Sequence, residues 1–79
     1  QGNLAMVKYC VENGCPMDEY ACYNAAKEGH LDVLKYLHEN DCPWNSSACY
    51  CAHRDNRIDC LNYLIQQKAP NWDRYVNNP

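Results

Sequence analysis

The chain has 79 residues, a formal net charge of −3 and no run of Lys or Arg. This charge pattern argues against a nucleic-acid ligand, because proteins that bind nucleic acids carry a basic stripe. No stretch approaches the roughly 18 apolar residues of a membrane helix, so we expect no membrane insertion. One core in so short a chain is marginal, which favours repetition with shared interfaces, a partner, a metal or disulfides.

A repeat of 27 residues organises the chain. Residues 15–41 and 42–68 are identical at ten of their 27 aligned positions. Residues 1–14 form the second half of an earlier unit, and residues 69–79 begin a further or capping unit. A period of this length indicates a solenoid, in which stacked units bury a shared core. Since Gln1 falls within a unit, we expect the chain to be part of a longer array.

Each unit is predicted to hold two helices. In residues 15–41 the first helix runs from about Asp18 to Glu28, and Gly29 ends it, as a left-handed residue commonly ends a helix. This helix carries a stripe of small residues at helical spacing, which allows close approach of a neighbouring helix. The stripe comprises Ala21, Cys22, Ala25 and Ala26.

The second helix is predicted from about Leu31 to Glu39 and stops before Pro43, because the residue preceding a proline avoids the α region. Leu34 lies at the centre of this unit and should be almost completely buried. Its apolar neighbours are Leu31, Val33, Tyr36 and Leu37. With no alternating β pattern anywhere, the sequence predicts an all-α array.

Residues 25–37, AAKEGHLDVLKYL, together with residues 41–45, DCPWN, resemble an ankyrin repeat. The family's A-A-x-x-G-H and V-V/I-V-x-L-L stretches match well, and the resemblance covers essentially the whole chain. It implies a helix-turn-helix solenoid. The family's period is 33, so the shorter period here implies shortened hairpin loops. In its shorter period the chain resembles the short ankyrin variant with a Gly-Cys-Pro-Trp turn that is common in protists and large DNA viruses.

The resemblance also implies a binding face, formed by the hairpin side and the first helices. Carried over by position, this face comprises Tyr20, Tyr23, Asn24, Lys27, Ser47, Tyr50, Cys51 and Arg54, with Met17, Glu19, Trp44 and Ser46 along its rim. Tyr and Trp are favoured both at interfaces and at the edge of a core. For Tyr23, Tyr50 and Trp44, packing therefore remains an alternative to partner contact.

Other residues are predicted to have structural roles. By the resemblance, His30 should bond the backbone of a neighbouring turn, whereas His38 should be solvated. Tyr9, Tyr36 and Tyr63 occupy equivalent positions on the second helices and should cover the outer side of the core.

Seven cysteines approach the density of a secreted disulfide scaffold. Six of them occupy positions that the repeat defines, and free Cys behaves as a small buried hydrophobe. We therefore expect reduced thiols and an intracellular, cytoplasmic location; a disulfide framework is the alternative. The exception is Cys51, which stands where the other unit has Asn24, a position expected to be exposed.

Residues 49–53, CYCAH, are the most metal-like cluster in the sequence. On a helix, Cys49 and His53 share a face while Cys51 points elsewhere, so the three cannot close on one ion. A nucleophilic Cys51 beside Arg54 lacks a base with an orienting partner and an oxyanion hole. We therefore expect no metal, no cofactor and no enzymatic activity.

The sequence thus predicts a protein-interaction module built as an ankyrin-like scaffold, whose protein partner the repeat pattern does not identify. Solenoids of this kind offer an extended concave surface to other proteins. Two alternatives remain: a structural filler that stabilises a large assembly, and a module that depends on thiols or zinc.

Overall fold

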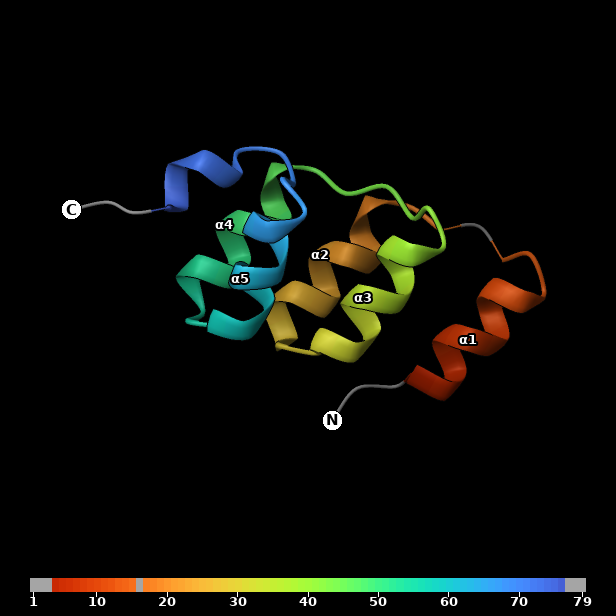
Figure 1. The fold of residues 1–79 in the computed structure, drawn as a ribbon. Coiled ribbons are helices and arrows are strands. Elements are labelled where there is room, and N and C mark those ends of the chain that lie inside the picture. The colour runs from red at the N-terminus through yellow and green to blue at the C-terminus, as the bar shows by residue number, and fades with distance from the viewer. Residues whose placement is uncertain (1–3, 16, 77–79) are drawn as a thin grey trace.

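The computed structural model describes residues 4–15 and 17–76. These residues form the α-helices α1 Leu4–Glu12, α2 Glu19–Glu28, α3 Leu31–Glu39, α4 Ser46–Arg54 and α5 Ile58–Gln66, and the short 3-10 helix η1 Trp72–Tyr75 (Figure 1). No strand occurs in this described part of the chain, which confirms the all-α prediction. The bounds of α2 and α3 agree closely with those expected from the repeat.

The helices form two layers along an elongated molecule of 44 × 22 × 16 Å. The first helices, α2 and α4, pack against each other in one layer, and the second helices, α1, α3 and α5, follow one another in the other. Each first helix also packs on the second helix of its own unit (Figure 1). The η1 helix packs against α4 and α5 at the C-terminal end. This arrangement is the helix-turn-helix stack that the sequence predicts.

Equivalent residues cap the two first helices. The side chain of Asp18 accepts a hydrogen bond from the backbone N–H of Tyr20 at 3.0 Å, and Asn45 accepts one from Ser47 at 2.9 Å. Such caps satisfy backbone donors that have no partner within the helix. They fix where each unit begins after its turn.

The second helices all end in the same turn. One residue adopts a left-handed conformation, namely Gly14, Asp41 or Lys68. The next residue donates its N–H to a carbonyl five positions back, for example Cys42 to Leu37 at 3.0 Å. This pattern is a Schellman motif, which closes a helix by satisfying its last carbonyls.

The core lies between the two layers in the central units. Leu34 is completely buried, as expected; Leu64 is also completely buried, and Leu37 is nearly so. In the first helices the small side chains of the predicted stripe are buried, apart from the half-buried Ala21. Small residues there allow α2 and α4 to approach closely.

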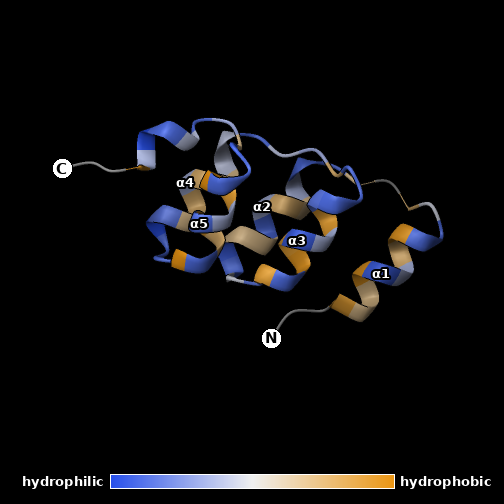
Figure 2. Ribbon diagram, in the orientation of Figure 1, coloured by the Kyte–Doolittle hydropathy of each residue, from blue (hydrophilic) through white to orange (hydrophobic). Residues whose placement is uncertain are grey.

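The α1 helix is packed on one side only. It carries hydrophobic residues along much of its length (Figure 2), yet none of its residues is buried. Tyr9 is 67% exposed and does not cover the core, so that prediction was wrong. The cognate rings of Tyr36 and Tyr63 are half-buried, and Lys8 and Lys35 of the preceding second helices lie over them, at 5.7 and 5.8 Å.

Candidate interaction surface

The exposed face of the first helices carries a row of tyrosines. Tyr20 and Tyr23 of α2 stack with ring centroids 5.6 Å apart, and Tyr50 follows on α4. Tyr20 is 62% exposed and Tyr50 53% exposed, whereas Tyr23 is half-buried. The N-caps of α2 and α4 set the register that brings these rings to one side. Large, rigid and amphipathic rings of this kind are suited to contact with another protein.

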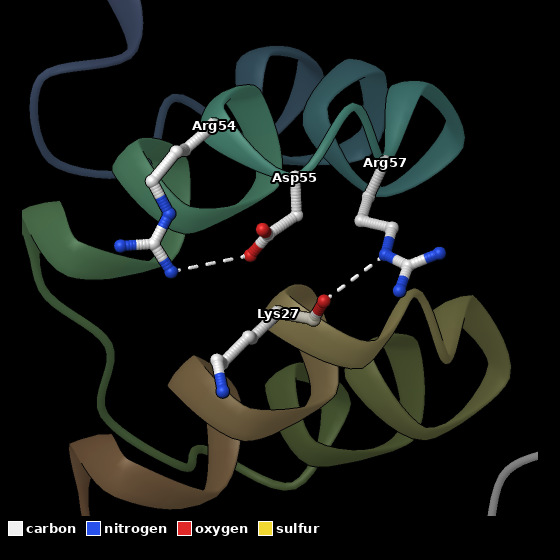
Figure 3. Close-up of polar contacts among 4 residues, drawn as sticks. All are labelled: Lys27, Arg54, Asp55 and Arg57. Atoms are coloured by element: carbon white, nitrogen blue, oxygen red, sulfur yellow. Dashed lines mark hydrogen bonds and ion pairs between the residues drawn. The ribbon is translucent and has the colours of Figure 1, made fainter.

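A cation follows each of the cognate tyrosines Tyr23 and Tyr50 by one helical turn. Lys27 follows Tyr23 on α2, and the Arg54 guanidinium lies over the Tyr50 ring at 5.6 Å on α4. Arg54 also forms an ion pair with Asp55 at 3.4 Å (Figure 3), and this hydrogen bond raises the pKa of the guanidinium above its usual range. We call Tyr20, Tyr23, Lys27, Tyr50 and Arg54 the first-helix strip.

A hydrogen bond between the two units ties the C-terminal end of α2 to the start of α5. Arg57 Nε donates to the backbone carbonyl of Lys27 at 3.0 Å, across the junction between α2 and α5 (Figure 3). Its side chain also lies against Gly29, where an added Cβ would come within 2.9 Å of Arg57 Cδ. Gly29 has φ of 77°, so both its conformation and this contact favour glycine.

Sequence reasoning assigned this bonding role to His30 and missed Arg57. The two residues are cognates in the repeat, and in the described part of the chain the bond is made at the later of the two positions. His30 makes no side-chain cap on its helix and instead lines an open groove. The repeat register could have identified Arg57, since it occupies the same position one unit later.

The predicted binding residue Cys51 is not on the surface. Its side chain is only 2% exposed, so the expectation of an exposed thiol was wrong. Cys51 lies on α4, which packs along α2, whereas its cognate Asn24 lines the groove beside α1. The position therefore faces the preceding first helix and is covered wherever that helix is present.

That groove, of about 390 Å³, lies between α1, α2 and α3 and has a largely apolar lining. The groove residues on α2 have cognates in the next unit, where α4 packs against α2. These cognates are Ala48, Cys51 and Ala52 of α4 and its C-cap residue Asp55. The groove is lined by Val7, Met17, Ala21, Asn24, Ala25, Glu28, His30, Val33 and Leu37. The groove thus lies where a preceding first helix would pack on α2, as α2 itself packs on α4.

The predicted rim residues do not form one surface. Trp44 stacks on His38 at 4.1 Å with an interplanar angle of 9°, and its ring meets the edge of Tyr63. This stack lies against the second helices and leaves His38 half-buried rather than solvated. Met17 lines the groove, while Glu19 and Ser46 are exposed near the N-termini of their helices.

The half-buried Ser47 contributes its backbone N–H to the cap of α4. We therefore leave Ser47 and the rim residues outside the first-helix strip.

The thiols and histidines offer little for chemistry. Cys49 is buried, and burial raises the pKa of its thiol to about 11. His53 is exposed and lies beside Tyr75 of η1, with ring centroids 5.0 Å apart. In the parts of the chain that the structure covers, no group of three or more His, Cys, Asp or Glu side chains could hold a metal ion.

None of the described helices has the length and apolar character needed to cross a bilayer.

Comparison with known proteins identifies the family. Residues 1–75 match the family model for ankyrin repeats, in three copies. Neither the curated proteins nor the solved structures gave a match. The family match spans nearly the whole chain, including all the helices described above.

Proposed function

The chain belongs to the ankyrin repeat family, whose repeats are generally protein-interaction modules without enzymatic activity, and we propose on that basis that it binds a protein partner through the first-helix strip. The observation that carries this proposal is the repeated spacing of a tyrosine and a cation on successive first helices, each of which also exposes a tyrosine, Tyr20 or Tyr50. Interfaces concentrate their binding energy in a few Tyr, Trp and Arg anchors.

The strip is prepared for binding before a partner arrives. The Tyr50 ring and the Arg54 guanidinium already contact each other, so less side-chain freedom is lost on association. Arg57, the N-cap residue of α5, joins its unit to α2 through the carbonyl of Lys27. These contacts support a rigid recognition surface rather than a flexible one.

The partner class that best fits the strip is an acidic or mixed peptide surface. Lys27 and Arg54 gather positive charge on one face of a chain whose net charge is −3. Asp55 neutralises Arg54 in part, which favours a peptide that combines carboxylates with apolar side chains over a highly charged one. Nucleic acid is a poor fit, because the chain lacks an extended basic stripe.

We also propose that these units are part of a longer array of repeats. We propose further that the protein is located in the cytoplasm. The groove beside α1 supports the array, because its lining matches the surface that α2 covers in the next unit. The location is supported by the number of cysteines that serve as core residues, which suits a reducing compartment.

A peptide selection tests the proposed function. Peptides chosen from a random displayed library by the unmodified chain should be enriched in Asp and Glu. Tyr50→Ala and Arg54→Ala should each weaken the binding of the selected peptides by about 1 kcal/mol or more, which is about fivefold in Kd. The helical circular dichroism signal should be unchanged, since both residues are exposed.

Lys35→Ala is the matched control, because Lys35 is an exposed cation over a tyrosine ring on a second helix. It should leave peptide affinity unchanged. Equal losses in Lys35→Ala and Arg54→Ala would contradict the assignment to the strip. A selection that yields no binding peptide would favour the alternative, a structural filler within an assembly.

A further inference from the structure

Two cysteines meet at the turn that ends α1. Cys10 and Cys15 occupy the two positions of the Schellman motif whose side chains normally contact each other. The N–H of Cys15 donates to the carbonyl of Cys10 at 2.9 Å, and Gly14 between them has φ of 76°. The backbone of this turn therefore brings the two side chains together.

The two thiols lie at the same turn and are accessible. The neighbouring Cys15 thiol raises the pKa of Cys10. Cys15 is exposed and Cys10 is half-buried, whereas the other five cysteines are buried. The pair at this turn thus combines proximity with access to reagents in solution.

The other units show that this pairing is not required by the turn. The cognate positions hold Leu37 with Cys42 and Leu64 with Ala69, and both of these turns have the same hydrogen bond, at 3.0 and 2.9 Å. A Leu with a Cys or an Ala therefore satisfies the same turn. The turn that ends α1 therefore does not require the thiols of Cys10 and Cys15.

A second pair of thiols provides an internal comparison. The thiols of Cys22 and Cys42 also influence each other's pKa, but both are buried, and burial raises the pKa of each. The Cys42 thiol donates a hydrogen bond to the carbonyl of Asp18 at 3.4 Å. A thiol must ionise before it can attack a disulfide, so this pair should react slowly. Proximity of two thiols is common to the two pairs, and access distinguishes them.

We propose that Cys10 and Cys15 form a thiol–disulfide exchange site that small disulfides such as glutathione disulfide convert into an intramolecular disulfide. The thiolate of the more exposed Cys15 attacks one sulfur of glutathione disulfide, forms a mixed disulfide and releases one glutathione thiolate. The thiolate of Cys10 then attacks the Cys15 sulfur and releases the second glutathione. The two released thiolates take up the two protons that the cysteines lost.

The disulfide would lock the last turn of α1 and its exit towards Met17, which lines the groove. Because the bond closes a short segment that is already folded back on itself, we expect the helical content to stay the same. Dithiothreitol should reverse the reaction, since exposed disulfides of this kind are readily reduced.

The test is to treat the whole chain with glutathione disulfide and then map its disulfides by proteolysis and mass spectrometry. The expected product has lost two hydrogen atoms and contains a Cys10–Cys15 disulfide, with the other five thiols free. A stable glutathione adduct on Cys15, a faster link between Cys22 and Cys42, or no reaction would each overturn the proposal.

The repeat supplies matched variants that should fold. Cys10→Leu places at this turn the residue that the other two units use, and Cys15→Ala does the same on the model of Ala69. Cys10→Leu should stop at a mixed disulfide with one glutathione on Cys15, and Cys15→Ala should react at least tenfold more slowly. As the control, Cys42→Ala should form the Cys10–Cys15 disulfide at the unmodified rate. Loss of the reaction in Cys42→Ala would also overturn the proposal.

Discussion

The junction between α2 and α4 and the region beside α1 are built from the same repeat, yet one is closed and the other is open. At the junction, α2 covers Ala48, Cys51 and Ala52, all of which are buried. Beside α1, the cognate residues line a groove. The comparison teaches that the repeat register determines which way a residue faces, while a neighbouring first helix completes the burial of Ala48 and Cys51, whose cognates Ala21 and Asn24 are only half-buried.

The two regions should differ most in how much stability is lost when a leucine is truncated to alanine. Leu34→Ala should lower the free energy of unfolding by about 2–5 kcal/mol, because it leaves a cavity at a fully buried site. Leu4→Ala, the same change on the half-buried side of α1, should cost about 1 kcal/mol or less. Urea unfolding followed by circular dichroism measures both. Equal costs would mean that α1 is packed as fully as α3.

The next largest difference in stability should follow when an arginine is placed at the cognate positions 51 and 24. Cys51→Arg should cost about 1–3 kcal/mol, because a large side chain is forced between α2 and α4. Asn24→Arg places the same side chain in the open groove and should change stability by no more than about 0.5 kcal/mol. If thermal unfolding shows Asn24→Arg to be as damaging as Cys51→Arg, the groove is not open in solution.

Much of this fold could be predicted from the sequence because the repeat specifies it three times. The bounds of α2 and α3, the burial of Leu34 and the all-α class all follow from helical spacing and end signals. The exposure of Cys51 could not be predicted, because it depends on contact with α2, which belongs to another unit.

The candidate site was predicted only in part. The first-helix strip follows from the family resemblance together with the exposed register of Tyr20 and Tyr50. The stack of Trp44 on His38 joins a turn to a helix through side-chain conformations that spacing does not determine. These contacts are specific to one unit, and a repeat pattern describes only what the units share.

A smaller difference in stability should appear when the cognate residues His30 and Arg57 are each replaced by alanine. Arg57→Ala should cost about 0.5–1.5 kcal/mol, because the carbonyl of Lys27 loses its hydrogen bond. His30→Ala, at the cognate position, makes no such bond and should be nearly neutral. Chemical denaturation of the two variants side by side distinguishes them. The reverse order of stabilities would restore the role first assigned to His30.

The smallest expected effect concerns the ring contacts of the second helices. Lys35→Ala should cost about 0.5 kcal/mol, since Lys35 lies over the Tyr63 ring at an exposed site. Lys8→Ala, at the cognate position over Tyr36, should cost a similar amount. A double variant should show additive losses in thermal unfolding, because the two contacts share no residue. Strong non-additivity would indicate that the second helices move as one unit.

The most direct test of the proposed function is the footprint of a bound peptide on the isotopically labelled chain, measured by nuclear magnetic resonance. An acidic peptide from the selection should shift the backbone amide signals of the first-helix strip, centred on Tyr23, Lys27, Tyr50 and Arg54. The signals of the groove and of the second helices should stay in place. A footprint centred on Lys35 and His38, or on the groove residues Val7 and His30, would contradict the assignment of partner binding to the first helices.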